Sequence, residues 1–274
     1  MKSSKIKILI ILFSVYHISF SNAQTDRDSL IKYSYYIYGV YKGNDINHVN
    51  ITQGTCFFIK YKEKTFLVSA KHVLTSWSAS NSVKRGNYPD TLYVRLRKVN
   101  QNEFTFYPLD ISSLKNDEKE DFYFNEPDYC FIEIKDANKF QINSIENLIF
   151  RNSEITIQNA LIFGYPELDD DDFSNFRLRD ASCIEGVLVS SPNENINYNF
   201  AVKNKQIFDS INYAVKSKSR VKPGYSGAPV FLYKPSTKQW IFSGVTSQGI
   251  TEDSLIFIVK PNYLLSNLKE KIIK

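Results

Sequence analysis

The sequence contains few of the side chains from which metal centres are built. Its 274 residues include three cysteines and three histidines. The cysteines are widely spread, and only His48 and His72 lie beyond the N-terminal segment, so the clustered ligands of a zinc site are missing. Residues 169–172 are consecutive aspartates, but they lack the alternating oxygen ligands and the glycine of a calcium-binding loop. The sequence therefore predicts no metal site and no cofactor.

A long apolar run is also missing. The apolar stretch at residues 8–20 is shorter than the ~20 residues that a membrane-spanning helix needs. Lysines precede it, and small residues at positions 21 and 23 follow it, which is the three-part form of a secretory signal peptide. We therefore expect residues 1–23 to be removed and the mature chain to be exported to the periplasm or the cell exterior. No cysteine follows the expected cut, so no stable membrane anchor is expected.

The sequence has little excess charge of either sign. Removing the three lysines of the N-terminal segment from the formal charge of +5 leaves +2. A charge this small argues against a nucleic-acid partner, because such partners are bound through clustered basic side chains. The roughly 250 residues that remain are enough for one large all-β domain or two smaller barrels.

Short strands dominate the expected secondary structure. Runs rich in Val, Ile, Phe and Tyr recur between polar loops, and no internal segment has a convincing helical period. The class is all-β. Strands are predicted at residues 33–41, 54–61, 65–69, 92–98 and 128–134 in the first half, and at 155–163, 183–189, 211–215, 228–233, 240–246 and 255–259 in the second. The charged stretches 115–126 and 167–172 are expected to be solvated loops.

Two local patterns complete this outline. Residues 62–64 (KEK) separate two strand-like runs, which indicates a hairpin that delivers the chain to His72. After Pro261, leucines at 264, 265 and 268 have helical spacing, and proline is well suited to a first helical turn. We therefore predict one short amphipathic helix at the C-terminus.

One serine is enclosed by glycines in a loop before a predicted strand. Residues 224–229 have the sequence GYSGAP, with Ser226 at their centre. Gly224 permits backbone conformations that are closed to other residues, so its N–H and that of Ser226 can point at one spot, as an oxyanion hole requires. A plain glycine and proline turn before a strand would have the same local pattern.

A serine hydroxyl needs a neighbouring base to act as a nucleophile, and His72 is the better of two candidates. It follows an apolar strand directly, whereas His48 lies in a polar loop. Asp128 opens the apolar run 129–134, where a strand passes from solvent into the core, so it best fits the carboxylate that orients the histidine. Other aspartates, such as Asp121, lie in more hydrophilic surroundings. Taken singly, His72 and Asp128 are equally typical of ordinary strand ends.

Together these motifs resemble those of the chymotrypsin-like serine peptidases, which have the same chain order of His, Asp and Ser. Residues 69–72 (SAKH) are similar to the family's T/S-A-x-H, residues 128–130 (DYC) to its D-x-A, and residues 224–229 to its G-x-S-G-x-P. Residues 163–166 (FGYP) resemble in particular the bacterial glutamyl-endopeptidase and heat-shock-protease branch, here without a PDZ domain.

The resemblance implies a fold and an activity. The fold would be two six-stranded antiparallel β-barrels, at residues 24–145 and 146–274, with the active site in the cleft between them. The activity would be that of a serine endopeptidase acting on polypeptides, with Ser226 as nucleophile, His72 as general base and Asp128 orienting the histidine. The Gly224 and Ser226 amides would form the oxyanion hole. The alternative is a binding protein that kept the fold without the activity, and no pattern indicates an oligomeric state.

The resemblance also implies where the substrate binds. Residues 244–249 (GVTSQG) look like the strand that lines the primary specificity pocket. The residues expected around the pocket are Arg220, Val221, Thr246, Ser247 and Gly249. Because this set contains a cation and no acid, we expect Lys and Arg to be rejected at the cleaved residue and Glu or Asp to be favoured.

Two further expectations concern Tyr225 and the cysteines. Tyr225 stands where the family has the acid that receives a freed N-terminal amine, so activation of the animal zymogen type is not expected. The resemblance places Cys56 and Cys130 on neighbouring strands of the first barrel, so any disulfide would join these two. The alternative is that both are buried free thiols, which need no partner.

Overall fold

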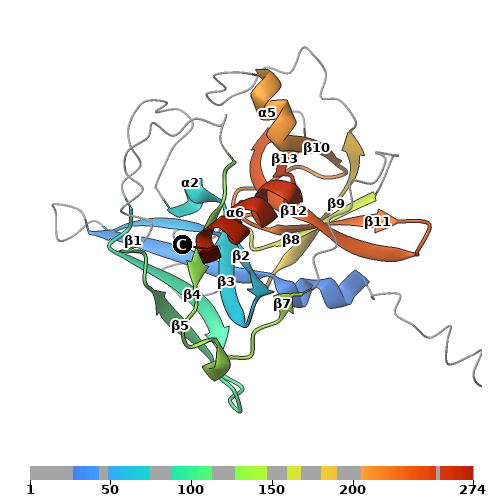
Figure 1. The fold of residues 1–274 in the computed structure, drawn as a ribbon. Coiled ribbons are helices and arrows are strands. Elements are labelled where there is room, and N and C mark those ends of the chain that lie inside the picture. The colour runs from blue at the N-terminus through green and yellow to red at the C-terminus, as the bar shows by residue number, and fades with distance from the viewer. Residues whose placement is uncertain are drawn as a thin grey trace, which may run out of the picture.

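The computed structural model describes residues 27–42, 49–74, 88–112, 127–146, 159–167, 180–189, 205–250 and 254–273 (Figure 1). The predicted signal peptide, most of the two charged stretches and the start of the strand predicted at 155–163 lie outside these residues. The elements are η1 Arg27–Tyr33, β1 Tyr35–Lys42, β2 Val49–Tyr61, β3 Lys64–Ser69, α2 Lys71–Leu74, β4 Thr91–Arg97, β5 Phe104–Leu109, β6 Cys130–Glu133, η3 Ala137–Lys139, β7 Ser144–Ile145, β8 Asn159–Gly164, β9 Ser182–Val189, α5 Lys205–Ile211, β10 Asn212–Ser217, β11 Pro229–Lys234, β12 Gln239–Ile250, β13 Leu255–Val259 and α6 Pro261–Ile273.

The first half of the chain forms a seven-stranded sheet. Its order is β5-β4-β1-β2-β3-β6, and β7 pairs parallel with β2. Alternation of side chains decides which face is buried, because Leu92, Val94 and Leu96 of β4 enter the core while the residues between them are partly exposed. The sequence predicts six antiparallel strands here, without β7. A two-residue strand has no period that a sequence pattern could reveal.

The second half forms a closed six-stranded barrel, as predicted. Its strand order is β10-β13-β12-β11-β8-β9. All five residues of β13 are buried, because the strand lies between β10 and β12 and is covered on both faces. The barrel interior holds branched apolar side chains such as Ile162, Val215, Val230 and Ile256.

The helices differ in how well the sequence foretells them. The C-terminal helix α6 begins at Pro261 as predicted, and its Leu264 and Leu268 are fully buried. Helix α5 was not expected. It is one-sided, with Phe208 buried and Ile207 exposed, but its seven residues are too short for a convincing helical period.

A shared hydrophobic cluster joins the two halves. Phe57 and Val68 of the first sheet pack in one cluster with Phe231 and Phe242 of the barrel and with Leu268 of α6. The rings of Phe57 and Phe242 are 5.2 Å apart between centroids. Burying side chains of this size stabilises a fold by about 1.5–3 kcal/mol each. The junction therefore holds the facing edges of both halves in a fixed relation.

Candidate active site

His72 lies in a single helical turn that follows the end of β3. Strand β3 is paired on both sides, with β2 and β6, so its end is rigidly placed. The Val73 amide donates to the Ala70 carbonyl at 3.2 Å, which turns the chain at once. Val73 and Leu74 are buried in the first core, whereas the His72 side chain keeps 14% of its surface exposed and lines the cleft.

Both carboxylate oxygens of Asp128 contact His72. Oδ2 lies 2.6 Å from His72 Nδ1, and Oδ1 accepts a hydrogen bond from the His72 backbone N–H at 3.1 Å. Asp128 stands just before β6, and its side chain is 1% exposed. An ionised carboxylate can only accept, so Nδ1 carries the proton in this contact and Nε2 of the neutral ring is left as an acceptor.

Ser247 supplies a third hydrogen bond to this carboxylate. Its hydroxyl donates to Asp128 Oδ2 at 2.7 Å. Burial by itself would raise the pKa of Asp128, but the electrostatic attraction of the His72 ring and the hydrogen bonds from His72 and Ser247 outweigh burial and hold that pKa below its usual value. From the sequence, Ser247 is expected to take part in substrate binding only. No sequence signal connects it to a carboxylate 119 positions earlier.

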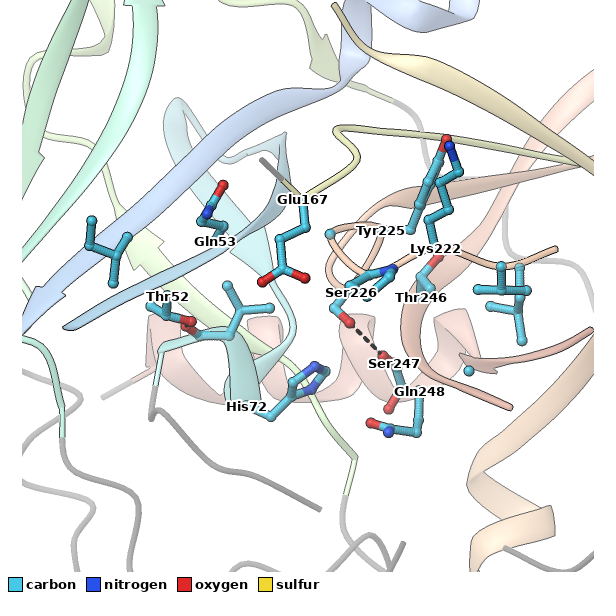
Figure 2. Close-up of a pocket in the computed structure, with 17 residues that line it drawn as sticks. Thr52, Gln53, His72, Glu167, Lys222, Tyr225, Ser226, Thr246, Ser247 and Gln248 are labelled. Atoms are coloured by element: carbon cyan, nitrogen blue, oxygen red, sulfur yellow. Dashed lines mark hydrogen bonds between the residues drawn. The ribbon is translucent and has the colours of Figure 1, made fainter. Parts of the chain in front are cut away.

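The loop that carries Ser226 is bound to the first half of the chain. The Thr55 amide donates to the Ser226 carbonyl at 3.0 Å, and Thr55 Oγ1 donates to the Gly224 carbonyl at 2.8 Å. Ser226 Oγ donates to the Ser247 carbonyl at 3.2 Å (Figure 2). Among the described residues, Asp128 and Ser226 are thus each linked to Ser247, and no hydrogen bond joins His72 directly to Ser226.

Two glycines give this loop its shape. Gly224 and Gly227 have φ angles of +97° and +84°. A Cβ on Gly224 would lie 2.3 Å from the Tyr165 carbonyl oxygen, and one on Gly227 would lie 2.1 Å from the Thr55 oxygen. Within the described part of the chain, the Gly224 and Ser226 amides donate no backbone hydrogen bond, so both remain available to an oxygen of a ligand.

Tyr225 anchors the same loop from the opposite side. Its hydroxyl forms a short hydrogen bond with the Ser182 hydroxyl on β9. The ring also packs closely against Gly164, where a Cβ would approach Tyr225 Cδ1 to 2.7 Å. The side chain that stands in place of the family's acid is therefore held by a neutral partner in the barrel.

A cavity of about 490 Å³ connects these groups. Its walls include His72, Gly224 and Ser226 together with four of the predicted substrate-binding residues, and those four are Val221, Thr246, Ser247 and Gly249. Arg220 is exposed and does not belong to the lining, whereas Lys222 does. Thr246 Oγ1 is buried and has no hydrogen-bond partner among the described residues.

Two further residues of the cavity lining are not indicated by any sequence motif. Glu167 and Gln53 line the cavity as well, so the cavity as a whole contains an acid, which the residues expected around the specificity pocket do not include. In Figure 2, Glu167 and Gln53 lie on one side of Ser226, and Lys222 and Thr246 lie on the other. Glu167 directly follows the FGYP stretch that carried part of the family resemblance, but its entry into the cavity depends on chain packing that no motif encodes.

The cysteines correct another expectation. Cys56 pairs with Ser69 across β2 and β3, and Ser69 pairs with Cys130 across β3 and β6, so a whole strand separates the two thiols. Two strand spacings of ~4.8 Å put their Cα atoms about 10 Å apart, beyond the ~7 Å that a disulfide can span. All three cysteines are free, and Cys130 Sγ donates to the Ser69 carbonyl at 3.7 Å. Burial raises the pKa of the Cys56 thiol far above its ordinary value.

Within the described ranges, no group of three His, Cys, Asp or Glu side chains could hold a metal ion. A search of the same residues for a helix of membrane-spanning length and hydropathy finds none.

Comparison with known proteins identifies the fold. No model of a known family matches the sequence, and no curated protein matches it. Solved structures that are similar to the chain include two proteases. One is the thermostable serine protease AL20 from an extremophilic microorganism, with a TM-score of 0.52 and 11% identity over 84% of this chain and 91% of that one. The other is the protease Anisep from Arthrobacter nicotinovorans, with a TM-score of 0.51 and 14% identity over 84% and 90% of the two chains. The protein therefore has the fold of the chymotrypsin-like serine proteases.

Proposed function

We propose that the protein is an exported serine endopeptidase that hydrolyses peptide bonds of polypeptides. The observation that carries the proposal is the buried Asp128 carboxylate bonded to Nδ1 of His72, in the same cleft as Ser226. A carboxylate, an imidazole and a glycine-flanked serine are the groups that acyl transfer requires in this order of contact. The fold shared with serine proteases supports the same assignment.

In the proposed mechanism, the Ser226 hydroxyl leaves the Ser247 carbonyl and donates to His72 Nε2 when a substrate enters. Ser226 Oγ then attacks the scissile carbonyl carbon while its proton passes to Nε2. The Gly224 and Ser226 amides bind the oxygen that becomes negative. Collapse of the tetrahedral intermediate breaks the C–N bond, and His72 returns the proton to the leaving amine. Water then attacks the carbonyl carbon of the acyl-enzyme while His72 takes its proton. The bond to Ser226 Oγ breaks, His72 returns the proton to this oxygen, and the acid is released. Asp128 stays ionised throughout.

We further propose that the cleaved residue is not Lys or Arg. Val221, Thr246 and Gly249 give the cavity uncharged lining, and Thr246 lies on the side of Ser226 where Lys222 also lies (Figure 2). A lysine in the lining disfavours a second cation in the same cavity. Arg220, on which a preference for Glu or Asp depended, does not line the cavity. The acidic preference is therefore not part of this proposal.

The test is covalent labelling of the mature protein with a fluorophosphonate, followed by peptide mapping and assay on a peptide library. We expect one label, on Ser226, and cleavage that Ser226→Ala and His72→Ala each lower by about 10⁴-fold or more. Asp128→Asn should keep the shape of the site and lower turnover by about 10⁴-fold, because it disfavours the required tautomer. Full peptidase activity in Ser226→Ala would reject the mechanism.

The rival function is a binding protein that kept the fold without the chemistry. The observation in its favour is that the Ser226 hydroxyl donates to the Ser247 carbonyl and not to His72. A binding protein would leave Ser226 unlabelled while still retaining an intact fold by circular dichroism.

A further inference from the structure

The outer face of the first sheet carries a row of aromatic side chains that starts at the cleft. Gln53 on β2 is directly opposite Tyr38 on β1, and Tyr38 is opposite Tyr93 on β4. Residues directly opposite each other share one face of a sheet, so these three form a continuous row across three strands. Gln53 lines the cavity, and the row therefore leads from the candidate active site onto the open face of the sheet.

Ring contacts extend this row to β5. Tyr38 stacks on Tyr93 at 5.1 Å between centroids and meets Phe106 edge to face at 5.2 Å. Arg95 is opposite Phe106, and Arg97 is opposite Phe104. We call this surface, made of Tyr38, Tyr93, Arg95, Arg97, Phe104 and Phe106, the aromatic-arginine face.

Phe104 lies between two cations at the outer end of this face. The guanidinium carbons of Arg95 and Arg97 are 4.0 and 4.6 Å from its ring centroid. Phe104 nevertheless keeps 50% of its surface exposed, which is unusual for so large an apolar side chain. Among the described residues, neither arginine forms an ion pair, so the face presents aromatic rings and uncompensated positive charge to its surroundings.

Contacts below this face tie it to the cleft. The Tyr36 hydroxyl donates to Gln53 Oε1 at 2.9 Å, and its ring stacks with Tyr38 at 6.0 Å. Tyr36 also meets Tyr165 edge to face at 5.7 Å. Tyr165 lies two positions before Glu167 in the chain and is close enough to Arg95 for that charge to influence its pKa. The aromatic-arginine face and one wall of the cavity are therefore one connected structure.

We propose that the aromatic-arginine face binds the part of a polypeptide substrate that follows the scissile bond, through acidic and aromatic side chains of that segment. This inference rests on the proposed peptidase function and names the substrate that the site prefers. Val221, Thr246 and Gly249 receive the acyl side, and Gln53 lies across Ser226 from Thr246 (Figure 2), so the leaving segment exits toward Gln53. Carboxylates complement Arg95 and Arg97, and aromatic side chains complement Phe104 and Tyr93.

The dimensions of the sheet define the length of this segment. From β2 to β5 there are three strand spacings of ~4.8 Å, or about 14 Å, and an extended chain covers this distance with about four residues at ~3.3 Å each. The preferred acidic and aromatic residues are thus expected a few positions beyond the scissile bond, outside the reach of short synthetic peptides.

The experiment compares fluorogenic peptides with one identical cleavage site. One peptide ends two residues after the scissile bond, one continues with a Gly/Ser segment of eight residues, and one continues with eight residues rich in Asp, Glu, Phe and Tyr. We expect the acidic and aromatic extension to raise kcat/KM about tenfold over the Gly/Ser extension, mainly through KM, because it adds ion pairs and ring contacts that the Gly/Ser extension cannot make. The gain should shrink with added salt.

Two double variants test whether the gain in kcat/KM comes from the aromatic-arginine face. Arg95→Gln combined with Phe104→Ala should abolish the gain and leave hydrolysis of the short peptide unchanged. Lys135→Gln combined with Ile207→Ala is the matched control, because it also replaces one cation and one exposed apolar side chain, but elsewhere on the surface. The Lys135 side chain is 77% exposed, and Ile207 is 45% exposed. This control should keep the full gain.

Failure of this inference differs from failure of the proposed function. If the short peptide is cleaved through Ser226 and the extensions make no difference, the face does not bind substrate. If no peptide is cleaved, the proposed peptidase function fails, and binding of the labelled extended peptide to Ser226→Ala, read by fluorescence anisotropy, still tests the face. A face that instead binds oligosaccharides, or that associates two copies of the chain in a Phe104-dependent way, would overturn the inference.

Discussion

The Asp128 carboxylate depends on three donors, and each of them lowers the free energy of its charged form. The His72 ring and the His72 amide supply two, and Ser247 supplies the third. Because the pKa of Asp128 is below its ordinary value of 3.8, its contribution to stability is fully present above about pH 4 and is lost as the pH falls through the folded-state pKa.

Ser247→Ala should weaken this contribution. We expect a loss of about 1.5–3 kcal/mol in the free energy of unfolding at pH 7, the usual range for a hydrogen bond to a charged group. The loss should become smaller toward pH 3, because a protonated carboxyl accepts a weaker hydrogen bond than a charged carboxylate. Urea unfolding at both pH values measures it.

Ser243→Ala is the control for that experiment. Ser243 lies on the same strand, and its hydroxyl donates to the neutral Ile241 carbonyl at 2.9 Å. Its effect should not change with pH. If the loss caused by Ser247→Ala, like that caused by Ser243→Ala, is the same at pH 3 as at pH 7, Asp128 is not stabilised through Ser247.

For single residues, roles that depend on residue type and position in a strand could be predicted from the sequence. Contacts that depend on how the chain packs could not. His72 and Asp128 were selected because each stands at a strand end, and the structure bonds them to each other. Ser247 and Glu167 have no such local sign. Their positions depend on how the two halves meet.

The loop around Ser226 is shaped by backbone contacts from both halves, so its glycines are sensitive to any side chain. Gly224→Ala would press a Cβ against the Tyr165 oxygen and the Glu167 amide, at 2.3 and 2.4 Å, and would force an L-residue to φ +97°. We expect kcat to fall by about 10²–10³-fold, as when an oxyanion donor is lost, with little change in KM. Burst kinetics with an active-site titrant measure this.

The outcome is informative only if the rest of the molecule stays folded. Near-ultraviolet circular dichroism of Gly224→Ala should match that of the parent protein, because the strain is confined to one loop. Unimpaired turnover would mean that the Gly224 amide does not take part in binding the oxyanion.

Strands were the elements best predicted, because a strand with one buried face alternates apolar and polar residues along the sequence. Strand β3 was predicted at residues 65–69 and is observed at Lys64–Ser69, and β13 was predicted and is observed at Leu255–Val259. Strand β5 was missed, because its outward residues include Phe104 and Phe106, so the polar half of the alternation is absent. The cysteine pair was misplaced because strand order, unlike strand existence, is not a local property.

The cluster that joins the halves makes a prediction for the molecule as a whole. Leu268→Ala removes a fully buried side chain of α6 from this cluster and should cost about 2–5 kcal/mol. Ile207→Ala, at a position 45% exposed, should stay within about 0.5 kcal/mol of the parent. Both are measured by urea denaturation. The Leu268→Ala transition should remain a single step, and two separate steps would mean that the halves unfold independently.

The anchoring of the Ser226 loop by Thr55 also has a consequence in time. The residues that complete the site come from distant parts of the chain, because Thr55 and His72 are made early, whereas Ser226, Ser247 and the buried leucines of α6 are made later. A chain still emerging from the ribosome therefore has its imidazole before it has its hydroxyl and the closed barrel that supports it. The order of synthesis therefore delays assembly of the site until the barrel has closed.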